Sequence, residues 1–169
     1  MRDESDKLGR ERAKDVREAM DHAWQGYRKY AWGTDELAPK SQRGKESWGG
    51  MGVTLVDSLD TLWLMDMKDE FWEARDWVRD HLTFSHAGDV SVFETTIREL
   101  GGLLSAYDLS GDIVFKDKAK ELGDLLLPAF NTPSGIPTAR VNFRTGKSSG
   151  GRSVLAELGT LQVRIIYLS

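Results

Sequence analysis

The sequence of 169 residues contains no cysteine and only three histidines. Without cysteine, neither a disulfide framework nor a thiolate metal site can form, and the redox compartment stays undetermined. His22, His81 and His86 are scattered, and none has a partner at the spacing that metal ligands require. We therefore expect no metal site built on these residue types.

Long apolar runs and dense basic runs are also missing. No stretch approaches the roughly 18 to 20 apolar residues of a membrane-spanning helix, and residues 1–17 lack the apolar centre of a signal peptide. The net charge of −4 argues against nucleic acid as a partner. Because residues 1–17 are polar, we expect no targeting segment in this chain. With 40% hydrophobic and 30% charged residues, the composition is that of an ordinary globular domain.

Apolar residues recur every three or four positions along most of the chain, which is the period of amphipathic helices. The expected helices cover residues 7–31, 53–67, 71–82, 90–111, 112–130 and 153–169. The segment between the first two is rich in turn formers. Residues 131–152 lose the helical period and predict a long loop that carries a small β-hairpin.

This order of helices predicts an all-α architecture of stacked antiparallel helix pairs, with no other convincing strand. Leu55, Leu64 and Met65 lie outside the main apolar stripe of their helix, so we expect neighbours on two sides of it. The last helix stops in mid-pattern at Ser169. We interpret residues 1–169 as an incomplete portion of one domain.

Glu94 and Arg98 are the first candidates for chemistry. They are spaced i and i+4, so they share one helix face. The simpler interpretation is a surface salt bridge worth a few tenths of a kcal/mol. Their setting weakens this interpretation, because Thr95 and Thr96 are poor helix formers for an exposed surface and the helix is the most apolar of the chain.

Further polar and aromatic candidates have a structural and a functional interpretation each. Asp57 and Asp60 lie in an apolar helix and either make structural hydrogen bonds or face a shared cavity. Glu157 is a solvated helix residue in the simpler interpretation. Two tryptophans in the first loop, Trp32 and Trp48, could stack on the apolar face of a sugar, whereas the others suit a core.

Taken together, several segments carry a family resemblance. The most specific are FETTIRELGGLLSAYDLSGD (93–112) and LLPAFNTPSGIP (126–137); others are HAWQGYRKYAWGTDELAPKS (22–41), LVDSLDTLWLM (55–65) and SVLAELGTLQV (153–163). In this order and spacing they resemble the amino-terminal part of the class I α-mannosidases, glycoside hydrolase family 47. The resemblance covers nearly the whole chain from about Val16 onward.

The resemblance implies an (α/α)7 barrel that binds calcium and removes terminal α-1,2-linked mannose from high-mannose N-glycans with inversion. It implies the lumen or membrane of the endoplasmic reticulum or Golgi, and a membrane anchor in the full-length family member. By the same resemblance Glu94 is the catalytic acid, proposed to act through a water molecule. Arg98 lies against the glycan, and Glu157 belongs to the same cavity.

Two departures from the family pattern limit this expectation. Arg164 stands where the family usually has glutamate. The family's candidate base and calcium-binding threonine lie in later segments, so no residue of this chain is assigned to them, and we expect the chain alone to be inactive. The alternative is a non-catalytic glycan-binding member, or one that escorts misfolded glycoproteins to degradation. A helix-repeat interaction module is disfavoured, because no internal period is visible.

Overall fold

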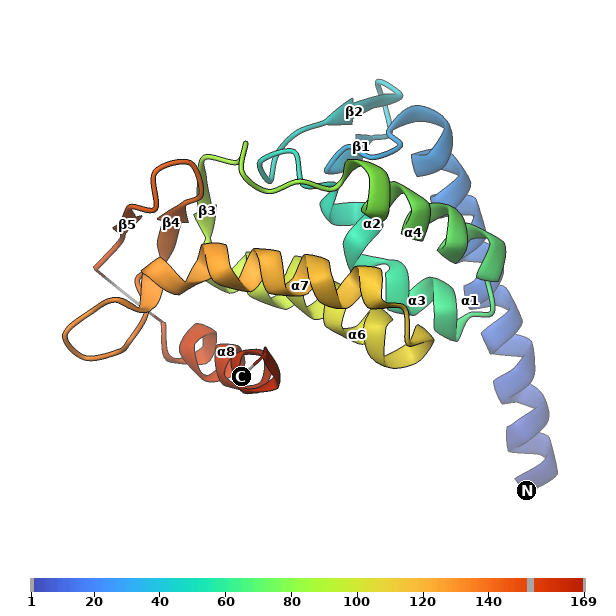
Figure 1. The fold of residues 1–169 in the computed structure, drawn as a ribbon. Helices are drawn as coiled ribbons and strands as arrows, with labels where there is room; N and C mark the ends of the chain where they lie inside the picture. The colour runs from blue at the N-terminus through green and yellow to red at the C-terminus, as the bar shows by residue number, and fades with distance from the viewer. Residues whose placement is uncertain (1, 152–153, 169) are drawn as a thin grey trace.

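A computed structural model of the protein describes residues 2–151 and 154–168. Helices form most of this part of the chain, and two small antiparallel sheets lie at its edges (Figure 1). The expected all-α architecture is therefore confirmed in its main features. Within the described ranges, no helix combines the length and the apolar character needed to cross a membrane.

Helix α1 (Arg2–Tyr30) begins earlier than predicted and packs only through its second half. Trp24 and Tyr27 are 2% exposed, and the Trp24 ring meets that of Trp32 edge-on at 5.8 Å between centroids. The first half extends away from the body of the molecule (Figure 1). Val16 lies in this extended part and is 55% exposed, although its spacing to the later apolar residues of the helix is that of one helix face.

A short hairpin follows in the segment expected to be a linker. Strands β1 (Glu36–Ala38) and β2 (Arg43–Lys45) pair antiparallel, with Leu37 opposite Gly44. The expectation of no strand outside residues 131–152 is therefore wrong. Strands of three residues are too short for the alternation of side chains to show in the sequence.

The predicted second helix is divided into α2 (Val53–Asp57) and α3 (Leu59–Leu64). At the break, the Ser58 hydroxyl donates a hydrogen bond of 2.6 Å to the carbonyl of Thr54. Serine hydroxyls compete with the backbone ladder in this way and bend helices. After a short turn, α4 (Lys68–His81) packs back against α3, which confirms the predicted helix hairpin.

The predicted fourth helix consists of four pieces. Strand β3 (Asp89–Ser91) leads into α5 (Val92–Thr95), and a π-helix, η1 (Thr96–Leu100), joins α5 to α6 (Gly101–Ser110). The helix ends at Gly111 as the sequence predicts, because φ is 71° there and glycine adopts this left-handed conformation without strain.

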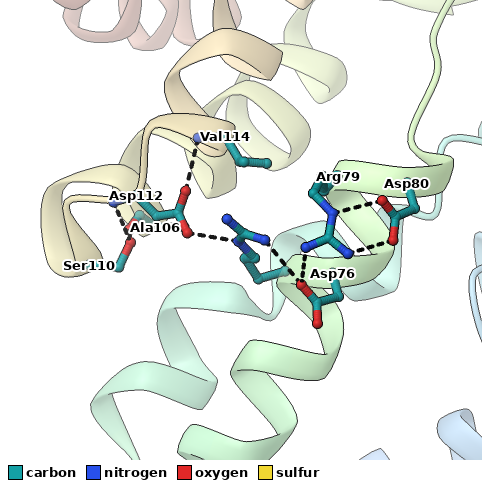
Figure 2. Close-up of polar contacts among 8 residues, drawn as sticks. Asp76, Arg79, Asp80, Ala106, Ser110, Asp112 and Val114 are labelled. Carbon is teal, nitrogen blue, oxygen red and sulfur yellow. Dashed lines mark hydrogen bonds and ion pairs between the residues drawn. The ribbon is translucent and has the colours of Figure 1, made fainter.

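Helix α7 (Ile113–Leu126) runs back antiparallel to α6 and ends in the short helix η2 (Leu127–Phe130). Asp112 begins it by accepting a hydrogen bond from the Val114 backbone N–H at 3.0 Å (Figure 2). Arg75 of α4 donates to the same carboxylate at 2.7 Å, and this ion pair holds the pKa of Asp112 below its usual value. Asp76 joins Arg75 to Arg79, so one polar network ties α4 to the start of α7.

The predicted hairpin in the long loop is confirmed as β4 (Arg140–Asn142) and β5 (Ser148–Ser149). It extends to a three-stranded sheet because β3 pairs antiparallel with β4. The last helix, α8 (Leu155–Leu168), then packs against α5, η1 and α7. This return brings the end of the described chain beside the segment that contains Glu94.

The core lies between α2, α3, α4, α6 and α7. Its largest fully buried side chains include Phe71 of α4 and Phe115 of α7, whose ring centroids are 5.5 Å apart. Gly102 allows α6 to approach α2 closely, since a Cβ there would lie 2.5 Å from the carbonyl oxygen of Val56. The π-helix η1 also packs against α2.

Candidate active site

Arg98 lies between two carboxylates at the junction of α2, α5 and η1. Its Nε donates to Glu94 Oε2 at 2.8 Å, and its Nη1 donates to Asp57 Oδ2 at 3.1 Å. The hydrogen bond that Arg98 donates to Glu94 is the main reason why the pKa of Arg98 is raised. The side chains of Arg98, Glu94 and Asp57 are 38%, 29% and 41% exposed, so this cluster can meet a molecule from solution.

The two threonines beside Glu94 are buried, as their poor fit to an exposed helix surface suggested. Thr95 and Thr96 are each 1% exposed, and the Thr96 hydroxyl donates to the carbonyl of Val92 at 2.7 Å. Glu94 and Arg98 are thus carried on a buried turn, with their charged ends toward the surface. A simple pair on a solvated helix does not describe this arrangement.

The backbone changes from an α-helix to a π-helix at Thr96, between Glu94 and Arg98. A π-turn holds one more residue than an α-turn, so the side chains beyond it are rotated, and such turns occur frequently at functional sites. No local pattern predicts this change, because apolar residues still follow at three- and four-residue spacing on either side.

Trp48 completes the cluster from the loop before α2. The Arg98 guanidinium carbon lies 5.4 Å from the centre of the Trp48 ring, within the range of a cation–π contact. Trp48 is partly exposed. Of the two loop tryptophans, the structure places Trp48 beside Arg98, whereas Trp32 packs against Trp24 and Tyr27.

Glu99 was not among the residues predicted from the sequence, and its side chain is fully buried. Both of its carboxyl oxygens lack a hydrogen-bond partner. Burial is the main cause that raises the pKa of Glu99 to about 8, and the negative charges of Asp35 and Asp57 act in the same direction. In the sequence, Glu99 follows Arg98 and looks like one more charged residue of an exposed surface.

The contacts of Asp60 and Glu157, the remaining candidates from the sequence, differ from each other. Asp60 accepts a hydrogen bond of 3.0 Å from the Ser105 hydroxyl of α6, which confirms its structural interpretation. Glu157 is partly buried in the first turn of α8, the helix that packs on α5 and η1. Among the described contacts, no hydrogen bond or ion pair joins Glu157 to Glu94 or Arg98. The side chain of Arg164 lies outside the described residues.

Comparison with known proteins identifies the family. The family model described as glycosyl hydrolase family 47 matches residues 19–169. The chain belongs to this family. A mannosyl-oligosaccharide 1,2-alpha-mannosidase of Arabidopsis thaliana is 52% identical over 170 residues, which cover 97% of this chain and 30% of the relative. The endoplasmic reticulum mannosyl-oligosaccharide 1,2-alpha-mannosidase of Homo sapiens is 50% identical over 162 residues, 94% of this chain and 23% of the relative.

The family 47 fold is also found among solved structures. The alpha-1,2-mannosidase from Trichoderma reesei superposes with a TM-score of 0.87 and 34% identity, over 94% of this chain and 36% of that enzyme. The helix pairs described above are therefore part of the family's α/α barrel. The chain spans less than a third of the length of the two curated relatives above.

Proposed function

We propose that the protein contributes the acid side of a glycosidase site that removes terminal α-1,2-linked mannose from high-mannose N-glycans. The observation that carries the proposal is the arrangement of Arg98 between Glu94, Asp57 and the Trp48 ring on a partly exposed surface. Guanidinium and carboxylate groups bind sugar hydroxyls through charge-assisted hydrogen bonds, and an indole offers an apolar surface.

In this proposal Glu94 is the general acid and acts through a water molecule, as the family resemblance implies. An inverting glycosidase needs one carboxylic acid that protonates the leaving oxygen and one carboxylate that activates water on the opposite face of the sugar. Arg98 holds the Glu94 carboxylate at 2.8 Å and directs its remaining hydrogen bonds toward the glycan. Glu157 is proposed to bind the glycan from α8, since this helix packs beside Glu94 and Arg98.

The proposal places residues 1–169 in the amino-terminal portion of a single (α/α)7 domain. Calcium is proposed as the cofactor of the whole domain by family resemblance. The residues that the structure describes contain no group of three or more His, Asp or Glu side chains that could hold a metal ion, so no step is assigned to the ion. The lumen of the endoplasmic reticulum or Golgi is proposed as the location, in line with the name of the human relative.

A chimera tests the role of Glu94. Residues 1–161 of this chain replace the matching part of the Arabidopsis relative, and release of mannose from a glycan with terminal α-1,2-linked mannose is measured with calcium present. We expect the chimera to release mannose and Glu94→Gln to lower kcat by about 10² to 10⁴-fold, since general acid catalysis contributes that much.

The matched control is Glu121→Gln, because Glu121 forms an exposed ion pair with Lys118 in α7, away from Glu94. It should leave kcat unchanged. The 169-residue chain alone is expected to release no mannose, with or without calcium. Undiminished release by the Glu94→Gln chimera would contradict the assignment, and glycan binding by an inactive chimera would favour the non-catalytic alternative.

A further inference from the structure

A second buried carboxylate, Asp35, organises the loop that carries Trp48. Asp35 is 0% exposed and accepts hydrogen bonds from four backbone N–H groups of that loop. Oδ2 accepts from Trp48 at 2.7 Å and Gly50 at 2.8 Å, and Oδ1 accepts from Gly52 at 2.9 Å and Val53 at 3.4 Å. Converging N–H groups of this kind form an anion-binding concavity, here filled by a side chain of the protein itself.

Other contacts restrict the same loop. Gly50 and Gly52 have φ of 76° and 67°, a left-handed conformation that side-chain-bearing residues rarely adopt. A ring nitrogen of His86 lies 3.0 Å from the Gly50 carbonyl oxygen. A Cβ at Gly52 would lie 2.6 Å from the Trp77 ring, so the loop packs directly on that ring. The loop therefore has one well-defined path around Asp35.

This path decides where the Trp48 ring lies. The backbone N–H of Trp48 makes the shortest of the four hydrogen bonds to Asp35. The Trp48 ring centre lies 5.4 Å from the Arg98 guanidinium carbon. Arg98 in turn binds Glu94 at 2.8 Å. A continuous series of contacts thus leads from the buried Asp35 carboxylate to the Glu94 carboxylate.

We propose that Asp35 is a positioning residue, which fixes the Trp48 ring against Arg98 and so presets the orientation of the guanidinium and of the Glu94 carboxylate. The part that concerns Glu94 rests on the function proposed above. Four N–H donors need both carboxylate oxygens as acceptors. An asparagine offers one acceptor, and its amide N–H₂ would face two donors. Asp35→Asn should therefore release the loop even though it is nearly isosteric.

The test follows Trp48 directly in the 169-residue chain. The tryptophans are labelled with 5-fluorotryptophan, and Trp48→Phe identifies the Trp48 signal in the ¹⁹F NMR spectrum. In Asp35→Asn we expect this signal to move by several linewidths toward that of an exposed indole. The signals of Trp63 and Trp72 should stay in place. Asp60→Asn is the matched control, because the amide oxygen can still accept from the Ser105 hydroxyl.

The effect of Arg98→Met on the Trp48 signal, measured with and without Asp35→Asn, distinguishes positioning by Asp35 from a general loss of structure. With Asp35 present, Arg98→Met should shift the Trp48 signal, because it removes the guanidinium from the ring. With Asp35→Asn, the same change should shift it no further, because the contact is already lost. An unmoved Trp48 signal in Asp35→Asn, or an equal effect of Arg98→Met in both backgrounds, would overturn the proposal.

A second variant covers the case in which Asp35→Asn does not fold, and an activity measurement tests the effect on Glu94. If Asp35→Asn does not fold, Gly50→Ala replaces it, since alanine strains φ at 76° and its Cβ would lie 3.0 Å from His86 Nε2. The same shift of Trp48 and the same loss of coupling are expected, and their absence overturns the proposal. In the active chimera, Asp35→Asn should lower kcat by about 10 to 10²-fold through misplacement of Glu94. A chimera that is inactive without any substitution argues against the glycosidase proposal only, since the NMR result needs no sugar.

Discussion

The Glu99 side chain is buried, and neither of its carboxyl oxygens has a hydrogen-bond partner. An unpartnered buried carboxyl group costs about 1 to 3 kcal/mol even when it is neutral, and far more when it is ionised. Its pKa of about 8 means that burial keeps it protonated at neutral pH, while Asp35 and Asp57 oppose its ionisation and Arg98 favours it. Glu99 is therefore neutral at pH 7, although the charges of Asp57 and Arg98 act on it.

The raised pKa of Glu99 predicts a loss of stability as pH rises. Below pH 4.5, its ordinary pKa, the group is protonated in the folded and the unfolded state. Between pH 4.5 and about 8 the folded protein keeps a proton that the unfolded chain has lost, so the free energy of unfolding falls. Above pH 8 the full penalty is present, at most about 5 kcal/mol for a pKa raised from 4.5 to about 8.

Glu99→Met removes this pH-dependent penalty, because methionine is apolar and of similar length but cannot ionise. Thermal unfolding followed by circular dichroism at pH 5, 7 and 9 should show a smaller loss of Tm with pH in the variant than in the parent chain. Glu121→Met is the control, since Glu121 is exposed. Parallel pH profiles of the parent and Glu99→Met would show that Glu99 is not the group responsible.

At the scale of elements, the close approach of α6 to α2 makes Gly102 a sensitive position. A Cβ at Gly102 would lie 2.5 Å from the Val56 carbonyl oxygen, and backbone atoms cannot move aside as a flexible side chain can. Gly102→Ala should lower the free energy of unfolding by about 1 to 3 kcal/mol through overpacking. Urea unfolding of the 169-residue chain measures the effect.

Gly9→Ala provides the matched control. Gly9 also lies within a helix, but no heavy atom would lie within 4 Å of an added Cβ. Alanine favours a helix over glycine by roughly 1 kcal/mol, so this substitution should not destabilise the chain. Equal midpoints for Gly102→Ala and the parent would mean that α2 and α6 can separate without cost.

The helix pairs were predictable because a buried helix face leaves its 3.6-residue period in the sequence. The break at Ser58 and the π-helix at 96–100 were not, since each changes the backbone locally while apolar residues keep the same spacing. The two sheets have strands of two or three residues, too few to show alternation. Local sequence thus predicts long elements, whereas tertiary contacts determine how they are interrupted.

The candidate site was predictable only in part. Glu94 and Arg98 were candidates from their spacing and setting, but their roles came from the family resemblance. Asp57 stayed open between a structural and a site residue until its 3.1 Å contact with Arg98 was known. Asp35 and Glu99 act through burial, which no local pattern reveals. Both follow or precede polar residues in the sequence, as exposed charges commonly do.

At the scale of the whole molecule, the described chain has a continuous core and yet leaves large apolar side chains exposed. Leu64 at the end of α3 is 72% exposed, and Leu155 at the start of α8 is 84% exposed. Leu127 and Val154, which lie near the two ends of the loop between α7 and α8, are more than half exposed. The chain matches 36% of the Trichoderma enzyme's length, so in that enzyme other parts of the barrel are available to surround the equivalent elements.

These exposed side chains predict that the isolated 169-residue chain associates with itself, because apolar surface that meets water is removed by contact between copies. Sedimentation velocity over a range of concentrations should show a weight-average mass that rises above that of a 19.0 kDa monomer. Leu64→Lys together with Leu155→Lys should lower this association, since each puts a charge on an exposed apolar position. Leu8→Lys is the matched control, because Leu8 is 45% exposed on the part of α1 that extends away from the body. A monodisperse monomer with a sharp melting transition at every concentration would show that this portion of the family 47 barrel is self-sufficient.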